Sequence, residues 1–228
     1  MKFHFSIRTA LKESWHIFAT HLLFFIVLSV VMLVLNVVSH EGENVFVSIL
    51  IGIAIIIWSY VWLSAALAAV DGKNDLLQLS AIHQHFPSFR QFWKIIAIGI
   101  LSAVISLVGF ILLIIPGIYF MTRLAFANLS YVDRQAGVRQ SLRYSWYLVR
   151  KEVFWTVLLT LIVCLVISVA GIALLWVGFL VAYPISMLLI TKLYRTLTLN
   201  HPPQEVVLQP LEVLPSTEEP ADPVVSKE

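Results

Sequence analysis

The sequence has few charged residues and almost no cysteine. Of its 228 residues, 12% are charged and 60% are hydrophobic, whereas soluble domains average roughly 25% charged and 45–50% apolar residues. A water-soluble core of this length has no room for so much apolar surface, so the composition indicates a membrane protein with several spans. The single cysteine, Cys164, excludes an internal disulfide and a cysteine-based metal cluster. It lies in an apolar run, where we expect it to be a small packing residue.

The sequence also lacks the motifs of the common catalytic classes. It has no P-loop, no dinucleotide-binding glycine pattern and no arrangement typical of a nucleophile triad. His83 and His85 stand in a polar loop without further ligands, so we predict no metal site. The basic residues are too few and too close to apolar runs to indicate a nucleic-acid partner. We therefore expect a protein that is not an enzyme and that holds no cofactor.

Six long apolar runs dominate the chain. A bilayer core of about 30 Å is crossed by roughly 20 helical residues. The predicted spans are His21–Ser39, Val45–Val70, Phe92–Ile115, Ile118–Val132, Val153–Leu175 and Gly178–Leu199, with a tight turn at Pro116-Gly117. The first run is longer than the apolar part of a signal peptide and has no small-x-small cleavage site before Glu41, so we expect it to be a true span.

The basic residues predict the orientation of these spans. Of the 15 lysine and arginine residues, all except Arg123 fall at the N-terminus, between the second and third spans, between the fourth and fifth, or at the C-terminal end. Cytoplasmic loops of membrane proteins carry an excess of such residues. We therefore expect a multi-pass protein of the bacterial cytoplasmic (inner) membrane with both termini in the cytoplasm. Residues 201–228 are rich in proline and acid and contain no aromatic residue, so we predict a disordered cytoplasmic tail.

Three segments on the predicted inner side resemble one another. Ala10–Trp15 reads Ala-Leu-Lys-Glu-Ser-Trp and Ser141–Trp146 reads Ser-Leu-Arg-Tyr-Ser-Trp, while Ala81–Phe86 keeps the small and aliphatic start and the aromatic sixth residue. Two further pairs match at similar offsets, as a duplicated unit should: Leu67–Asp71 with Leu129–Asp133, and Gly109–Leu113 with Gly171–Leu175.

The repeated unit leads to a fold prediction. We expect an all-α membrane protein whose six transmembrane helices form three helical hairpins, each preceded by a cytoplasmic interfacial amphipathic helix. The domain covers 1–200, in approximate repeats 1–71, 72–133 and 134–200. Helical spacing predicts that Trp15 lies on the apolar face of the first amphipathic helix, with Arg8 and Lys12 along another flank. It likewise predicts Trp146 on the apolar face of the third, opposite Arg139 and Arg143.

One stretch resembles a known family. Leu112–Tyr119, followed by Arg123 and by the Ser145-Trp146 pair, is similar to the membrane domain of glycerophosphoryl diester phosphodiesterases and to related six-span bacterial inner-membrane proteins of poorly defined function. The resemblance is best over Gly109–Leu161 and does not reach the tail. In that family hydrolysis belongs to a separate soluble barrel domain, which this sequence lacks. The resemblance therefore implies the fold and the membrane location, and it implies no activity.

Arg123 is the most distinctive candidate site residue. It lies within the fourth predicted span without an acidic residue at the same depth, and charges inside a membrane are costly and often functional. Its planar guanidinium suits a lipid phosphate or an anionic substrate. The alternative is structural: the side chain extends to the outer face or binds carbonyls freed near Pro116.

The other candidate residues are the basic residues of the interfacial helices. Arg8 and Lys12 precede the first span, and Arg139, Arg143, Arg150 and Lys151 precede the fifth. They suit anionic phospholipid headgroups, although setting the topology explains them as well. We expect a membrane-organising, lipid-interacting scaffold, with a protein partner at the cytoplasmic helices or tail as an option. A small transporter or permease subunit with an anion or lipid-headgroup site near Arg123 is the alternative.

Overall fold

The structure is a computed structural model that describes residues 5–41, 45–173 and 178–200. The predicted disordered tail at 201–228 and the last two residues of the fifth predicted span, 174 and 175, lie outside the described residues. The described residues form helices and contain no strand. In chain order the helices are α1 (Ile7–Thr20), α2 (Leu22–Glu41), α3 (Val45–Val70), η1 (Asn74–Leu77), η2 (Leu79–His85), α4 (Phe89–Leu112), α5 (Ile114–Leu124), α6 (Ala127–Arg134), α7 (Val138–Leu148), α8 (Lys151–Ala173) and α9 (Phe179–Asn200).

Among the described residues, four helices are long and apolar enough to cross a bilayer. The stretches are Leu22–Ser39 of α2, the whole of α3 and of α4, and Lys151–Gly171 of α8, with mean hydropathies of 2.4 to 2.8. In the apolar 18-residue part of each stretch, no more than 22% of the residues are buried inside the protein. Their helical backbone satisfies its own hydrogen bonds, so such surfaces can face lipid without penalty. The structure therefore confirms the predicted all-α class and provides four helices able to span a membrane.

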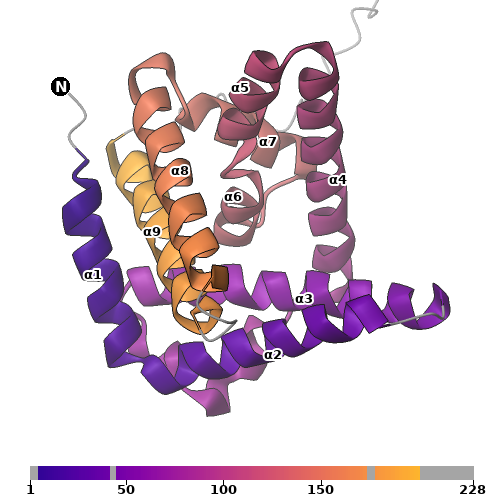
Figure 1. Ribbon diagram of the computed structural model, residues 1–228, viewed down its shortest axis with the longest axis vertical. Helices are drawn as coiled ribbons and strands as arrows, with labels where there is room; N and C mark the ends of the chain where they lie inside the picture. Colours follow the sequence, from indigo (N-terminus) through magenta and orange to yellow (C-terminus); the bar gives the residue numbers. More distant parts are fainter. Residues whose placement is uncertain (1–4, 42–44, 174–177, 201–228) are drawn as a thin grey trace, which may run out of the picture.

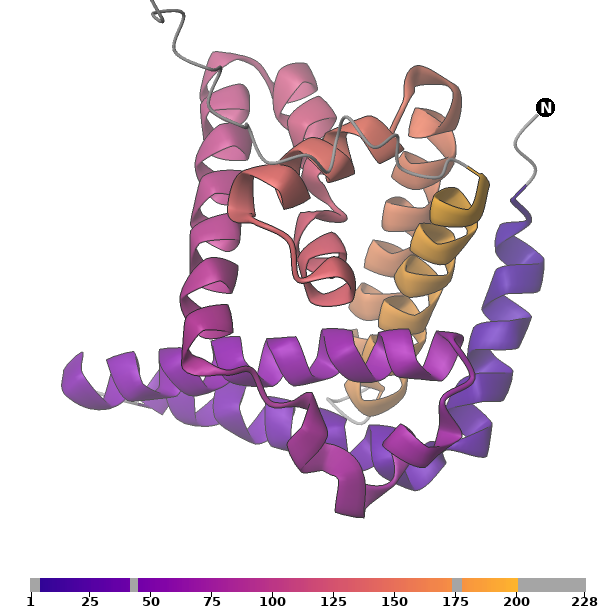
Figure 2. The same ribbon diagram turned by 180° about the vertical axis from the view of Figure 1, so that it is seen from behind.

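The helices pack in pairs that point in different directions. α2 packs against α3, α4 against α5, and α8 against α9, while α1 lies along α9. Figures 1 and 2 show α2 and α3 running across the molecule, at a steep angle to the upright α4 and α8. α4 ends at the top of Figure 1, where α5 begins, whereas α8 ends at the bottom, where α9 begins. The apolar helices therefore do not share one axis direction.

α9 packs against α1, α2, α3 and α8 and contributes to two core clusters. Its Leu188 belongs to a core cluster with Phe25 of α2 and Trp62 of α3, and its Leu193 and Tyr194 belong to a second cluster with residues of α4, α6, α7 and α8. The Trp62 side chain is fully buried inside the bundle and stacks on Phe25. α9 continues through Pro184, which is buried within it.

The fourth predicted span is not one helix. The structure divides Ile118–Val132 between α5 and α6, which meet at Ala125 and Phe126. The predicted turn at Pro116-Gly117 is also displaced: the chain turns at Leu113, and Pro116 lies in the first turn of α5. Proline is tolerated there because the first backbone N–H groups of a helix have no intrahelical partner.

The second predicted interfacial helix has a different form. Ala81–Phe86 falls in and just after η2, a 3-10 helix, instead of an α-helix. Pro87 follows this segment, and the residue before a proline disfavours the α conformation; Phe86 is extended. In this segment Ala81 and His85 are buried and Phe86 is exposed.

Glycines allow two of the helix pairs to approach closely. A Cβ atom on Gly109 would lie 2.7 Å from the Phe120 ring and 3.0 Å from the Cα of Gly117. A Cβ atom on Gly171 would lie 2.6 Å from the Cβ of Ala182. Because carbon atoms do not approach so closely, only glycine fits at these two crossings. The two positions are those that the sequence comparison matched.

Candidate functional site

Arg123, on α5, is buried against residues of α5 and α7. Its side chain is only 9% exposed. The Nη1 atom donates a hydrogen bond of 2.9 Å to the carbonyl oxygen of Trp146. The guanidinium carbon lies 4.8 Å from the centre of the Trp146 ring and 5.1 Å from that of Tyr119. Within the described part of the chain, no carboxylate forms an ion pair with it.

The positive charge of Arg123 is stabilised by groups other than a carboxylate. Trp146 lies in the last turn of α7, where the helix dipole presents partial negative charge. The faces of the two aromatic rings add a further attraction for a cation. The guanidinium therefore holds α5 against the end of α7. This geometry favours the structural alternative, in which the arginine binds carbonyl groups, although the carbonyl belongs to α7 and not to the region of Pro116.

Ser145, beside Trp146, holds the break between α5 and α6. Its hydroxyl donates a 2.8 Å hydrogen bond to the carbonyl oxygen of Arg123 and accepts a 3.2 Å hydrogen bond from the backbone N–H of Phe126. Both backbone groups lie where the helix is interrupted. Buried backbone groups need hydrogen-bond partners, and the Ser145 hydroxyl provides the partner that the interrupted helix does not give to these two groups. Sequence reasoning singled out the Ser145-Trp146 pair but did not connect it with Arg123.

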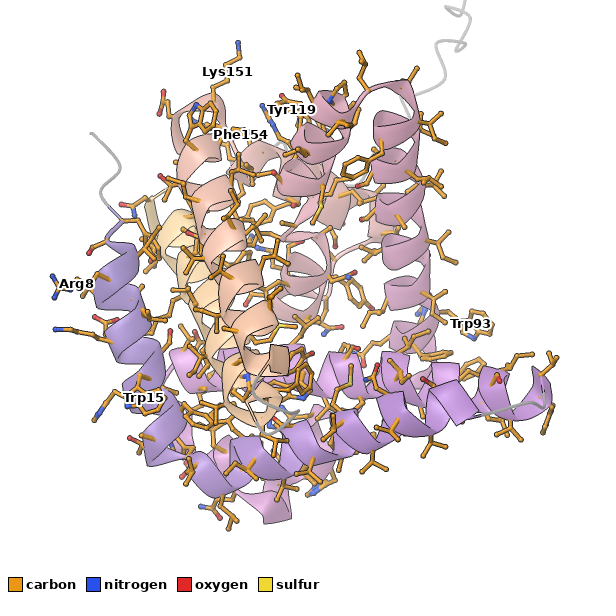
Figure 3. The ribbon with its side chains drawn as sticks, viewed as in Figure 1. Arg8, Trp15, Trp93, Tyr119, Lys151 and Phe154 are labelled. Carbon is orange, nitrogen blue, oxygen red and sulfur yellow. The ribbon has the colours of Figure 1, made fainter. Side chains whose placement is uncertain are left out.

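The other predicted site residues do not gather around Arg123. Arg8, Lys12, Arg139, Arg143 and Lys151 are exposed. Arg150 is half-buried and donates to the hydroxyl of Tyr147, with its guanidinium 4.4 Å from the centre of that ring. Figure 3 shows Arg8 pointing away from the bundle on α1 and Lys151 pointing outward at the start of α8.

The exposed basic residues form two matching stripes. On α1, Arg8, Lys12 and Trp15 follow one another at intervals of four and three residues, which places them on one face. Arg139, Arg143 and Trp146 repeat these intervals on α7. The structure leaves both tryptophans accessible beside the basic residues, since Trp15 is 54% exposed and Trp146 is 37% exposed.

The buried faces of α1 and α7 contain small residues beside larger ones. Ala10 and Ser14 are buried on α1 together with Phe18, and Ser141 and Ser145 are buried on α7 together with Leu142, Tyr144 and Leu148. The small side chains let each helix lie close to its neighbours, so the larger tryptophan is left on the outer side with the basic residues. Each stripe leads directly into an apolar helix, α2 or α8.

A charged cluster that sequence reasoning missed lies where α3, α6 and α9 end. Arg195 on α9 contacts the carboxylates of Asp71 at 2.6 Å and Asp133 at 2.8 Å. The hydroxyl of Tyr194 donates to Asp133 at 2.7 Å. The side chains of Asp71 and Arg195 are about a quarter exposed, and that of Asp133 is less so. We call this group the Asp71–Asp133–Arg195 cluster.

The spacing of this cluster is a signal that the sequence contains. Asp133 follows Asp71 by 62 residues, and Arg195 follows Asp133 by the same interval. The match of Asp71 with Asp133 was visible in the sequence comparison. A further step of 62 residues from Asp133 leads to Arg195, whose charge is opposite. A search for similar residues does not find this position, whereas a search for complementary charges at the same interval does.

Three cavities lined by described residues are considered as sites. A groove of about 580 Å³ between α1, α8 and α9 is lined by Leu11, Lys12, Trp15, His16, Ile167 and Ile185. A second, of about 470 Å³, lies between the start of α1 and the end of α9, and a third, of about 150 Å³, lies beside the Asp71–Asp133–Arg195 cluster. Among the described residues, Arg123 lines none of these three cavities.

Comparisons of the chain with protein-family models, with curated proteins and with solved structures found no match. The resemblance to the phosphodiesterase membrane domain therefore stays a prediction.

Proposed function

We propose that this chain is a non-enzymatic integral membrane protein that organises anionic phospholipid at the cytoplasmic face of a bacterial inner membrane. The observation that carries the proposal is the pair of basic stripes on α1 and α7. In each stripe two exposed cations and one exposed tryptophan share a face, and an apolar helix begins within a few residues. Exposed cations at a membrane surface attract anionic headgroups by about 1 kcal/mol each, and tryptophan favours the headgroup level.

The transporter alternative has less support. It needs an anion or headgroup site near Arg123, and that guanidinium already contacts the Trp146 carbonyl and two aromatic rings. A ligand would have to displace these partners. The exposed stripes need no such rearrangement.

Lipid selectivity in bilayers tests the proposed function. The protein is reconstituted with spin-labelled phosphatidylglycerol or phosphatidylcholine, and the motionally restricted fraction of each lipid is measured. We expect a preference for phosphatidylglycerol that is lost when Arg8, Lys12, Arg139 and Arg143 are all replaced by glutamine. Lys73→Gln, an exposed basic residue outside both stripes, serves as the control and should keep the preference. An unchanged preference in the fourfold variant would contradict the proposal.

We also propose the six-span topology, with three helical hairpins from repeats of one unit and both termini in the cytoplasm. The matching burial of Ala10, Ala81 and Ser141 and the matching exposure of Trp15, Phe86 and Trp146 support the repeat. α2 and α3 cross α4 and α8 at a steep angle, whereas helices that span one bilayer usually tilt only modestly from its normal. The six-span topology therefore needs a direct test.

Cysteine labelling tests this topology directly. In a Cys164→Ala background, single cysteines replace Ser88, Leu113 or Asn200, which are all exposed. A membrane-impermeant thiol reagent added from the periplasmic side should label the Leu113 position only. Labelling of Ser88 or Asn200 from that side, or failure at Leu113 with labelling from the cytoplasmic side, rules the topology out.

A further inference from the structure

The groove between α1, α8 and α9 has the composition of an amphiphile site. Leu11, Trp15, Ile167 and Ile185 give it apolar walls, and Lys12 and His16 are its polar residues. Its volume of about 580 Å³ lies within the range of roughly 300–1,000 Å³ found for small-molecule sites. Elsewhere on α8, Leu165, Val166 and Val169 are each more than half exposed, so the helix that borders the groove also presents an apolar surface.

The cations beside the groove are available to a ligand. Lys12 lies in its lining, and Arg8 precedes Lys12 by one helical turn on the same exposed face of α1. Within the described residues neither Arg8 nor Lys12 forms an ion pair, whereas the neighbouring Glu13 is paired with Lys192. The apolar walls of the groove suit an acyl chain, and the two cations without ion-pair partners suit an anionic headgroup.

The Arg123 site shows why this groove is open. Ile185 follows Arg123 by 62 residues, the interval that separates the members of the Asp71–Asp133–Arg195 cluster. Trp146 of the α7 stripe covers the Arg123 guanidinium, and Trp15 of the α1 stripe lines the groove together with Ile185. The two places therefore correspond. The long side chain of Arg123 fills the space under Trp146. The shorter side chain of Ile185 leaves the corresponding space beside Trp15 as a groove.

We infer that the groove between α1, α8 and α9 binds one anionic glycerophospholipid, with an acyl chain against Ile167 and Ile185 and the phosphate at Lys12 and Arg8. This inference rests on the proposed lipid-organising function and narrows it to one site. The α7 stripe carries the same charges, but its corresponding space is occupied by Arg123. The stripe on α7 therefore contacts lipid only at the surface.

Native mass spectrometry of the full chain tests the site. Delipidated protein is titrated with phosphatidylglycerol or phosphatidylcholine, and the population with one bound lipid is measured. We expect the first phosphatidylglycerol to bind more tightly than phosphatidylcholine. Replacing Arg8 and Lys12 by glutamine should weaken that binding about tenfold or more, because two headgroup contacts are lost.

Two further variants make the test specific. The matched control, Arg139→Gln with Arg143→Gln, removes the same charges from the α7 stripe, whose corresponding space is filled by Arg123, and should weaken the first binding step much less than the loss of Arg8 and Lys12. Ile167→Trp, at a half-buried position, fills the groove without changing charge and should weaken binding of the first lipid. Equal binding of both lipids, equal losses in the two charge variants, or full binding by Ile167→Trp would each overturn the site. The bilayer preference for phosphatidylglycerol could persist in those cases, so the two proposals fail separately.

Discussion

The Nη1 atom of Arg123 donates a hydrogen bond to the carbonyl oxygen of Trp146, and the guanidinium also lies over the ring of that same residue. One tryptophan thus supplies both a backbone acceptor and an aromatic face to a buried cation. This relationship joins the end of α5 to the end of α7. Arg123 therefore links these two helices through both its hydrogen bond and its ring contact.

Replacement of Arg123 should destabilise the protein. Arg123→Ala removes a charged hydrogen bond and two cation–π contacts, so we expect a loss of about 3 kcal/mol in the free energy of unfolding. Arg123→Lys should recover only part of this, because an ammonium lacks the planar fork that stacks on the rings. Thermal unfolding of the detergent-solubilised protein measures the loss. Arg139→Ala, at an exposed position, is the control; an Arg123→Ala variant as stable as the parent would contradict the structural role.

Ser145→Ala should cost about 1–3 kcal/mol, because it leaves the carbonyl of Arg123 and the N–H of Phe126 without their buried partner. The matched control is Ser14→Ala at the corresponding position of α1. The Ser14 hydroxyl is equally buried but only donates to the carbonyl of Ala10 within its own helix, so its removal should be nearly neutral. Equal losses for the two variants would show that Ser145 has no special role at the α5–α6 break.

Alanine at the two crossing glycines should destabilise the helix pairs. Gly109→Ala forces a methyl group against Phe120 and Gly117, and Gly171→Ala forces one against Ala182, so we expect each to cost roughly 1–3 kcal/mol. Gly52 and Gly99 lie within α3 and α4 with no atom within 4 Å of an added Cβ. Alanine at Gly52 or Gly99 should therefore stabilise its helix by up to about 1 kcal/mol. Unfolding curves of the four variants should separate into these two groups, and a uniform effect would refute the packing argument.

The Asp71–Asp133–Arg195 cluster should show energetic coupling. In a double-mutant cycle of Asp133→Asn and Arg195→Gln, we expect the double variant to be less destabilised than the sum of the single variants, by about 1–2 kcal/mol. Arg195→Gln alone should be the more harmful change, since it leaves two carboxylates without their shared partner. Strictly additive losses, measured by thermal unfolding, would mean that the contacts contribute no net stability.

Much of the fold follows from local properties of the chain. Long runs such as Val45–Val70 can only be apolar helices, and their observed bounds match the predicted span. The amphipathic character of α1 is likewise encoded in its spacing. Local pattern did not fix which way Trp15 faces, because a tryptophan suits both an apolar core and a headgroup level; the small residues Ala10 and Ser14, packed against neighbouring helices, decided it.

By itself the sequence determined the helical class, the apolar stretches, the matched segments and the isolation of Arg123 among apolar residues, because composition and periodicity are local. Only the tertiary structure decided what Arg123 touches and where its helix is interrupted. It also decided that Asp71, Asp133 and Arg195 meet. These features join residues that lie far apart along the chain, and no local pattern specifies which hydrogen-bond donor reaches which acceptor. The physical reason is that a buried charge or an interrupted helix must find partners, and the packing of several helices at once selects them.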